Sequence, residues 1–146
     1  QMVYEFQSIR NSVKTLYGED GYGDGSQIRA ALVRTKQLPS TLVLVTENSP
    51  IRNAFGGFVT IEGTDGGSRF RISYGKVPRR LCPGFLANAT KSGGWAFFNV
   101  VNDSESGPGN PQPINSWISM DDFLTQCNPT PSSPTPTSVL VTLWSD

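Results

Sequence analysis

The chain contains no histidine, and its 12 basic and 12 acidic residues leave a formal net charge of zero. Without histidine, the chain lacks the commonest general base and the commonest metal ligand, which excludes Ser-His-Asp and Cys-His catalysis as usually built. A neutral chain also exerts no overall electrostatic attraction on nucleic acid or on an anionic membrane. These absences argue against an enzyme and predict no cofactor, no metal site and no nucleic-acid partner.

Cysteine is scarce, since Cys82 and Cys127 are the only two in the chain. Two thiols are too few for a structural zinc site. In a small chain rich in predicted strands, an even count predicts one disulfide formed in an oxidising compartment, and the alternative is two unrelated buried thiols. In the chain-entropy model such a crosslink stabilises the fold by about 4 kcal/mol.

Long apolar runs are also absent from the sequence. No stretch is apolar for 18 residues, so no transmembrane helix is predicted, and the first residues do not have the pattern expected of a signal peptide. A length of 146 residues favours one domain, 1–146. The 15 glycines and 11 prolines indicate many turns and favour short strands over long helices.

The first element present is an amphipathic helix. Its apolar residues recur with helical spacing and predict a helix over 3–17. They are Val3, Phe6, Ile9, Val13 and Leu16. Gly18 is expected to end it, whereas only Gln1 and Met2 precede it and neither is a favoured N-cap. We therefore expect that the upstream part of a longer helix is missing from this sequence.

Two further helices are expected, at 27–37 and 120–126. Ser26 and Ser119 are their N-cap candidates. Asp121 and Asp122 fall in the first turn of the later helix, where they suit the helix dipole. Residues 77–90 are expected to form a short helix or coil around Cys82.

The strand pattern predicts an antiparallel sheet. Segments 57–63 and 69–74 alternate in polarity on either side of an Asp65-Gly66 turn, which indicates a hairpin. Further strands are predicted at 95–102 and 139–144, and 41–46 is either a strand or a buried connector. Residues 103–113 read as a loop and 128–138 as an extended Pro/Ser/Thr spacer. The order of elements predicts an α+β fold.

This order resembles that of a type IV pilin. The segments 53–61 (NAFGGFVTI) and 70–72 (FRI), followed by Val77-Pro78 and then Cys82, resemble the PilS-like type IVb branch. Cys82 and Cys127 look like the pair that bounds the C-terminal region of pilins. The resemblance implies a soluble domain in which 3–17 is the C-terminal half of a spine helix packed on an antiparallel sheet. It also implies an αβ-loop region with a short helix at 18–50, and a sheet with the disulfide-bounded region at 51–146.

The resemblance further implies a function. Such a chain would be a structural subunit that assembles by helix packing into an extracellular type IVb pilus, for adhesion, aggregation or conjugative mating contact. Its partners would be other copies, the inner-membrane assembly machinery, and a host or recipient cell surface. It would contact the membrane only through the missing N-terminal segment, before assembly. The alternatives are a minor tip pilin or pseudopilin, or a secreted carbohydrate- or protein-binding module.

Two regions are the candidate contact sites. The apolar stripe of the 3–17 helix is expected to pack between subunits. The loop after the predicted strand 95–102 is the candidate surface contact, because exposed loops commonly carry binding residues. Its candidate residues are Ser104, Glu105, Asn110 and Trp117.

Other patterns are weaker. Asp20 and Asp24 are acids that could hold calcium, although they lack EF-hand spacing. Asp121 and Asp122 with Glu105 imitate paired carboxylates, but a helix start explains both aspartates. The three tryptophans could form a sugar-stacking platform, but packing in the core is the simpler interpretation. Four arginines form a local basic cluster without interleaved aromatics, at positions 69, 71, 79 and 80.

The like charges of Arg10 and Lys14 lie four residues apart on the first helix, which disfavours an isolated helix slightly. Glu19 or Asp20 of an adjacent copy could relieve this repulsion. A solvated helix face is the simpler interpretation.

Overall fold

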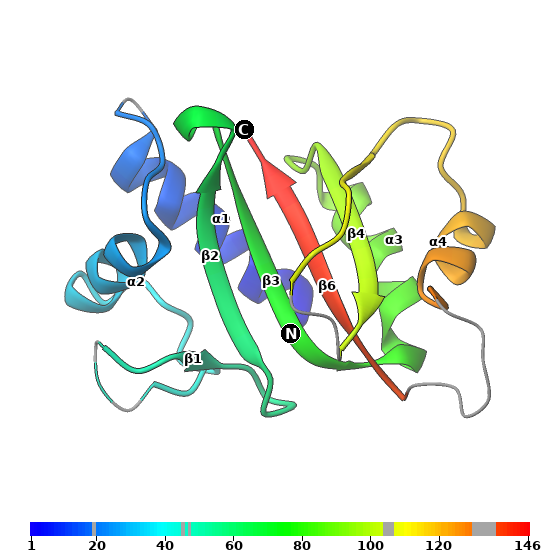
Figure 1. Ribbon diagram of the computed structural model, residues 1–146, viewed down its shortest axis with the longest axis horizontal. Helices are drawn as coiled ribbons and strands as arrows, with labels where there is room; N and C mark the ends of the chain where they lie inside the picture. The colour runs from blue at the N-terminus through cyan, green and yellow to red at the C-terminus, as the bar shows by residue number, and fades with distance from the viewer. Residues whose placement is uncertain (19, 45, 47, 104–106, 130–136) are drawn as a thin grey trace.

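The computed structural model describes residues 1–146 except 19, 45, 47, 104–106 and 130–136. A six-stranded sheet has the strand order β1-β2-β3-β6-β4-β5, and all of its neighbouring strands are antiparallel. The helices α1 and α3 lie against one face of this sheet, while α2 lies beside β2 and α4 beyond β4 (Figure 1). The predicted α+β fold, with an N-terminal helix packed on an antiparallel sheet, is confirmed.

The described strands differ widely in length. Two of them have only two residues each, β1 (Ile51–Arg52) and β5 (Gln112–Pro113). The others are β2 (Phe58–Thr64), β3 (Arg69–Pro78), β4 (Phe97–Asn102) and β6 (Ser138–Ser145). The prediction missed both two-residue strands, because neither is long enough to show an alternating pattern. Among the described residues of the segment 41–46, an isolated bridge from Val43 to Arg52 is the contact with the sheet ladder.

Helix α1 (Met2–Tyr17) confirms the predicted helix 3–17. Gly18 ends the helix, as expected, with right-handed backbone angles, and Gly21 a few residues later has a φ of 84°.

Helix α2 (Gly25–Arg34) begins and ends earlier than predicted. The expected cap at Ser26 is wrong, because Asp24 is the N-cap and its carboxylate accepts from the Ser26 amide at 2.7 Å. The helix ends before Lys36, whose φ of 56° is left-handed, rather than at the proline downstream.

The hairpin of β2 and β3 is confirmed. Its turn is a 3-10 element, η1 (Asp65–Gly67), in which all three residues have positive φ. Strand β3 runs further than predicted, through a register shift between Tyr74 and Val77. The expected helix or coil at 77–90 therefore divides into the end of β3, a 3-10 turn η2 (Arg79–Leu81) and helix α3 (Cys82–Ser92).

Helix α4 (Met120–Gln126) has the predicted bounds and cap. Ser119 and Asp122 form a capping box, in which the Ser119 amide donates to Asp122 Oδ2 at 2.8 Å. The last strand, β6, lies in the middle of the sheet between β3 and β4. Most of the predicted spacer 128–138 lies outside the described residues.

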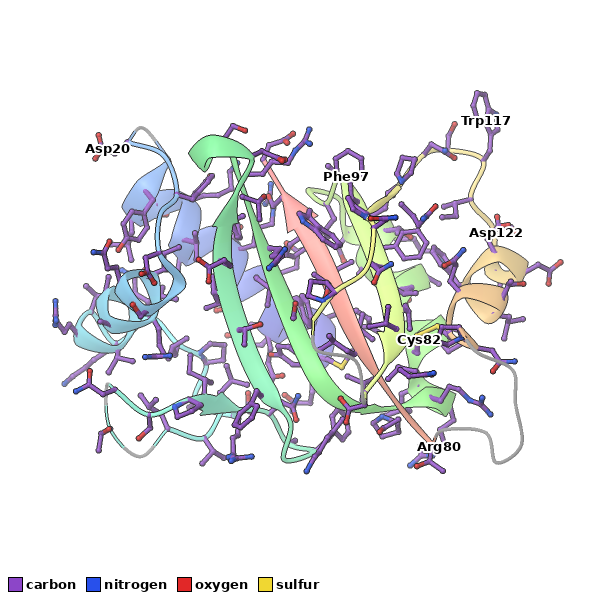
Figure 2. The ribbon with its side chains drawn as sticks, viewed as in Figure 1. Asp20, Arg80, Cys82, Phe97, Trp117 and Asp122 are labelled. Carbon is purple, nitrogen blue, oxygen red and sulfur yellow. A yellow bond between two sulfur atoms is a disulfide. The ribbon has the colours of Figure 1, made fainter. Side chains whose placement is uncertain are left out.

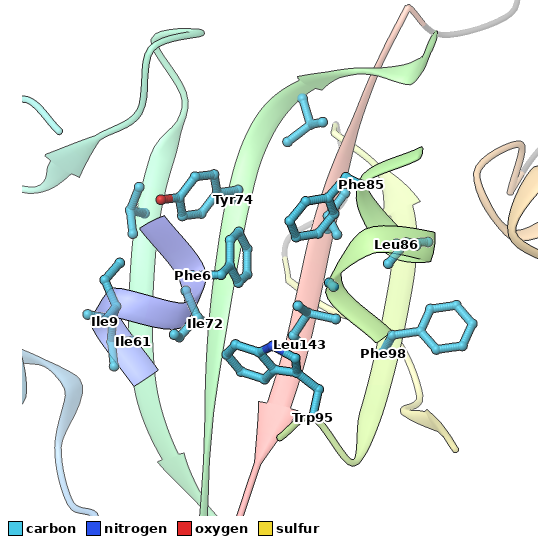
Figure 3. Close-up of a cluster of buried hydrophobic side chains, with 14 of the residues drawn as sticks. Phe6, Ile9, Ile61, Ile72, Tyr74, Phe85, Leu86, Trp95, Phe98 and Leu143 are labelled. Atoms are coloured by element: carbon cyan, nitrogen blue, oxygen red, sulfur yellow. The ribbon is translucent and has the colours of Figure 1, made fainter. Parts of the chain in front are cut away.

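The core lies between the sheet and the two helices on its inner face (Figure 3). Phe6 of α1 is central, with its ring centroid 4.3 Å from that of Tyr74, 4.9 Å from Phe85 and 5.9 Å from Trp95. Burial of four aromatic rings in contact accounts for a large share of the packing energy, since each removes about 150–250 Å² from water.

Candidate functional site

The apolar stripe of α1 packs inside the subunit. Phe6, Ile9 and Val13 are fully buried against the sheet, and Val3 and Leu16 are partly buried beside them. The expectation that all five residues pack between subunits therefore needs correction for the three buried ones. A 3.6-residue period identifies the buried side of a helix but does not say which molecule buries it.

The opposite side of α1 remains uncovered. Tyr4, Asn11 and Thr15 are exposed there, and Tyr4 keeps 66% of its surface accessible. These positions are separated by seven and four residues, so they share one face of the helix. This face, which we call the open face of α1, is where a neighbouring molecule can reach the helix.

Glu5 is an acid buried on the inner side of α1. Its carboxylate accepts hydrogen bonds from the Tyr74 hydroxyl at 3.0 Å and from the Thr41 hydroxyl. Burial, and then the negative charge and hydrogen bond of Glu5, raise the pKa of Tyr74 well above its usual range. Glu5 thus ties α1 both to β3 and to the segment after α2. The sequence shows a charged residue there without showing its partners.

The two like charges of α1 are satisfied within the subunit. Arg10 donates from Nε to Gly94 O at 3.0 Å and to Ser145 Oγ at 2.9 Å, and Lys14 donates to Asp146 O at 2.6 Å. These bonds hold α1 to the end of β6 and to the turn before β4. The hypothesis that an adjacent copy relieves this repulsion is therefore unnecessary.

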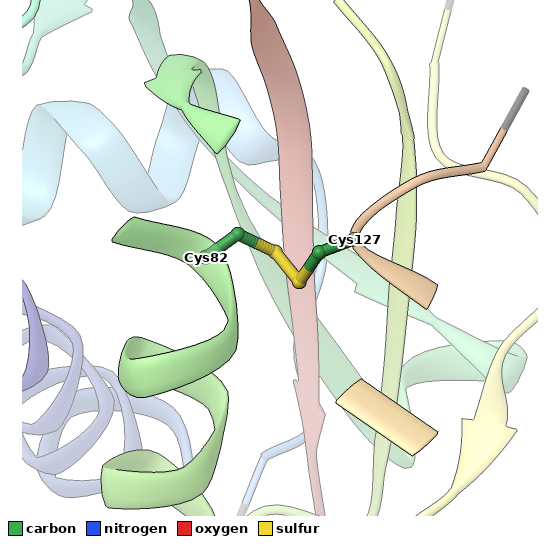
Figure 4. The surroundings of a disulfide bond; sticks show 2 residues. All are labelled: Cys82 and Cys127. Carbon is green, nitrogen blue, oxygen red and sulfur yellow. A yellow bond between two sulfur atoms is a disulfide. The ribbon is translucent and has the colours of Figure 1, made fainter. Parts of the chain in front are cut away.

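The two cysteines form a disulfide, as predicted (Figure 4). The bond joins Cys82 at the start of α3 to Cys127 just after α4, with 5.9 Å between the Cα atoms. Both residues are buried. The link spans a sequence separation of 45 residues, for which chain entropy predicts a stabilisation of about 4 kcal/mol. Helix α4 is thereby fastened to the body of the fold.

The predicted contact loop is described only in part. Ser104 and Glu105 lie outside the described residues, whereas Asn110 is exposed and Trp117 keeps 85% of its surface accessible. Figure 2 shows Trp117 projecting from the turn before α4. Its backbone amide donates to Asn115 Oδ1 at 3.0 Å, so an Asn-anchored turn holds the ring out in solvent.

Asn99 of β4 clamps the loop from below, a role that sequence reasoning missed. Its side chain donates to Asn110 O at 2.9 Å and accepts from the Gly109 amide at 2.8 Å. One buried amide thus satisfies two backbone groups of the loop. An asparagine within a strand pattern was the available signal, because such a residue needs a buried partner.

The weaker sequence patterns do not form shared sites. Asp24 caps α2, and the hydrogen bonds from the Ser26 amide and hydroxyl lower the pKa of Asp24. Among the described residues, no group of three His, Cys, Asp or Glu side chains is placed to hold a metal. Trp95 and Trp144 are buried while Trp117 is exposed, so the three rings share no platform.

The basic cluster is also divided. Arg69 pairs with Asp146 at 2.6 Å and with Asp65 at 3.4 Å, whereas Arg79 donates to Asn128 Oδ1 at 2.8 Å beyond the other end of β3. Within the described part of the chain, no helix is both long and apolar enough to cross a membrane.

The fold is that of a type IV pilin. A type IVb pilin from Salmonella typhi superposes with a TM-score of 0.69 and 17% identity, covering 96% of this chain and 95% of that one. TcpA, a type IV pilin from Vibrio cholerae El Tor biotype, gives 0.63 and 11%, covering 99% and 96%. No curated protein matches the chain.

The chain belongs to the PilS family. The family model described as PilS N terminal matches residues 1–142. The resemblance drawn from the segments around Phe58, Phe70 and Cys82 is confirmed, and the chain is a pilin subunit by family and by fold.

Proposed function

We propose that this PilS-family pilin is the structural subunit of a type IVb pilus, whose copies assemble through α1 into an extracellular filament. The observation that carries the proposal is the division of α1 into a buried face and an open face. The buried face makes the helix a rigid part of the subunit, so that contacts on the open face transmit force to the sheet. Unlike surfaces that meet head to tail generate an open helical fibre when the rotation between copies does not close into a ring.

The filament would serve adhesion, aggregation or conjugative mating contact. Support comes from Trp117, because tryptophan is enriched among the residues that contribute most of the binding energy at protein contacts. Before assembly, the full-length protein would reside in the inner membrane through an N-terminal apolar segment and meet the pilus assembly machinery there. The disulfide supports a mechanical role for the subunit, because it resists separation of α4 from the rest of the fold when a filament is pulled.

Electron microscopy of a deletion strain tests this proposal. Loss of all filaments, with recovery from a plasmid copy, is expected of a structural subunit. Filaments that persist but no longer adhere would identify a minor tip pilin. Filaments unchanged in number and adhesion would instead favour a secreted binding module.

A matched pair of variants tests the open face of α1. Asn11→Arg introduces a long charged side chain on this face and is expected to abolish filaments, while the thermal unfolding of the isolated chain stays unchanged. Asn88→Arg makes the same change at an exposed position of α3 and is expected to leave filaments intact. Normal filaments from the Asn11 variant would contradict the proposal.

A further inference from the structure

The face of the sheet opposite α1 carries a groove of about 670 Å³. Its floor is formed by outward side chains of β2 and β3, and residues 107–108 and Leu140 of β6 border it. Arg71, Ser73 and Gly75 follow one another along this side of β3. Positions 71 and 75 are about 13 Å apart at the usual rise of a strand, so the groove suits a linear ligand.

The acids of the groove are already bound by donors of the chain itself. Glu62 Oε1 accepts from the Gly25 amide at 3.0 Å. Asp103 accepts from the Lys76 amide at 2.9 Å and from the Ser138 hydroxyl at 3.4 Å. Both carboxylates therefore have a structural role, and neither needs a ligand to satisfy it.

Two of the three cations that line the groove are not bound in this way. Among the described residues, the Arg71 guanidinium and the Lys76 ammonium make neither a hydrogen bond nor an ion pair, although both line the groove. Glu62 lies directly across from Arg71 in the β-ladder, yet its carboxylate turns to α2 instead. The binding capacity left over in the groove is that of hydrogen-bond donors with positive charge.

An aromatic wall closes one end of the groove. Phe58 keeps 48% of its surface accessible, and the Arg52 guanidinium stacks over its ring at 4.4 Å from the centroid. Arg52 also donates to Gly56 O at 2.9 Å, which fixes this stack. The Thr60 hydroxyl lies on the same side of β2, between Phe58 and Glu62. A ligand in the groove thus meets cations, a hydroxyl group and an exposed aromatic ring.

We infer that this groove binds a linear acidic saccharide, with one carboxylate on Arg71, another near Lys76, and a sugar ring against Phe58. A planar guanidinium matches a carboxylate in bidentate geometry. An exposed aromatic ring offers a large apolar surface on which the C–H face of a sugar can pack. Addition of a peptide as a further strand is disfavoured here, because β3 lies inside the sheet, paired with β2 over 69–74 and with β6 on its other side.

Titration of the isolated chain with defined probes tests this inference. The probes are hexagalacturonate, its fully methyl-esterified form, and hexaglutamate, followed by calorimetry and by amide chemical shifts at Thr60 and Ser73. Hexagalacturonate is expected to bind at least tenfold more tightly than either of the others, and its affinity should fall as salt is raised. Equal affinity for the methyl ester, a tighter fit for hexaglutamate, or no binding at all would overturn the assignment.

Matched variants of three basic residues locate the site. Arg71→Gln and Lys76→Gln are each expected to weaken hexagalacturonate binding by roughly tenfold, the loss typical of one charge-assisted hydrogen bond. Arg80 is an exposed arginine outside the groove (Figure 2), and Arg80→Gln is expected to change the affinity for hexagalacturonate by less than about twofold. Equal losses in all three variants would overturn the assignment, provided that their melting temperatures agree. The test does not require polymerised protein, so its failure would leave the proposed filament role standing.

Discussion

Glu5 shows how one side chain constrains a whole helix. Most glutamates on an amphipathic helix face water, but Glu5 lies on the buried side of α1, where its carboxylate accepts hydrogen bonds from two hydroxyl groups. A buried carboxylate without its donors is costly, so the pairing with Tyr74 also determines the rotation of α1 about its own axis. The position of the open face of α1 depends on that rotation.

The pair of Tyr74 and Glu5 predicts a specific alkaline sensitivity. Because the pKa of Tyr74 is raised in the folded chain, its contribution to stability is complete below pH 10 and is lost as the pH rises beyond it. The free energy of unfolding should fall there by up to about 1.4 kcal/mol per pH unit from this group. Tyr74→Phe should remove this slope and cost about 1–3 kcal/mol at pH 7, because Glu5 loses a donor.

Denaturant unfolding followed by circular dichroism between pH 7 and 11.5 measures both effects. Tyr4→Phe is the control, because Tyr4 is exposed. The free energy of unfolding of this variant should change with pH as it does in the natural chain. Tyr22, whose pKa is also raised, chiefly by burial, contributes equally to all three proteins. An unchanged slope in the Tyr74 variant would show that the pairing does not control alkaline stability.

At the scale of elements, the disulfide determines the place of α4. This helix has seven residues, too few to be stable alone, and it buries one large side chain, Phe123. Replacing both Cys82 and Cys127 by serine should lower the free energy of unfolding by about 2–5 kcal/mol. Most helical signal should remain, because α1 packs on the sheet without the crosslink. In cells, the number of pili should fall sharply.

Thermal unfolding and pilus counts by electron microscopy check this prediction. Thr125→Ser, an exposed change in α4, is the control and should alter neither measurement. Normal pilus numbers from the double serine variant would remove the mechanical role of the disulfide, whatever its effect on stability.

Local chemistry explains which elements could be predicted. The Ser119 cap and the bounds of α4 were predictable because a capping box depends on residues three apart. The cap of α2 was misassigned because Asp24 and Ser26 are both good caps, and only their mutual hydrogen bond separates them. The strands β1 and β5 exist through pairing with distant residues, which no local pattern reveals. The Asn99 clamp and the partners of Glu5 are long-range for the same reason.

At the scale of the whole molecule, one tryptophan is placed for contact with other molecules and another for the stability of the fold. Trp117→Ala should change the free energy of unfolding by less than about 0.5 kcal/mol, because the ring touches little of its own chain. The same variant should reduce adhesion or bundling of filaments. Trp144→Ala, in the buried part of β6, is the contrasting control and should cost about 3–5 kcal/mol.

Calorimetry on the isolated chain and a cell-adhesion assay measure the two outcomes separately. Full adhesion and bundling by filaments that carry Trp117→Ala would place the contact surface elsewhere on the molecule.

The central position of β6 has a consequence for how the protein folds during its synthesis. Strands β3 and β4 are both made before β6, yet they meet only through it. Until residues 138–145 have been synthesised, β3 and β4 each have an unpaired edge, and the apolar residues that β6 covers are exposed. The sheet therefore cannot close before this segment has been made, and exposed strand edges of this kind favour pairing with other chains.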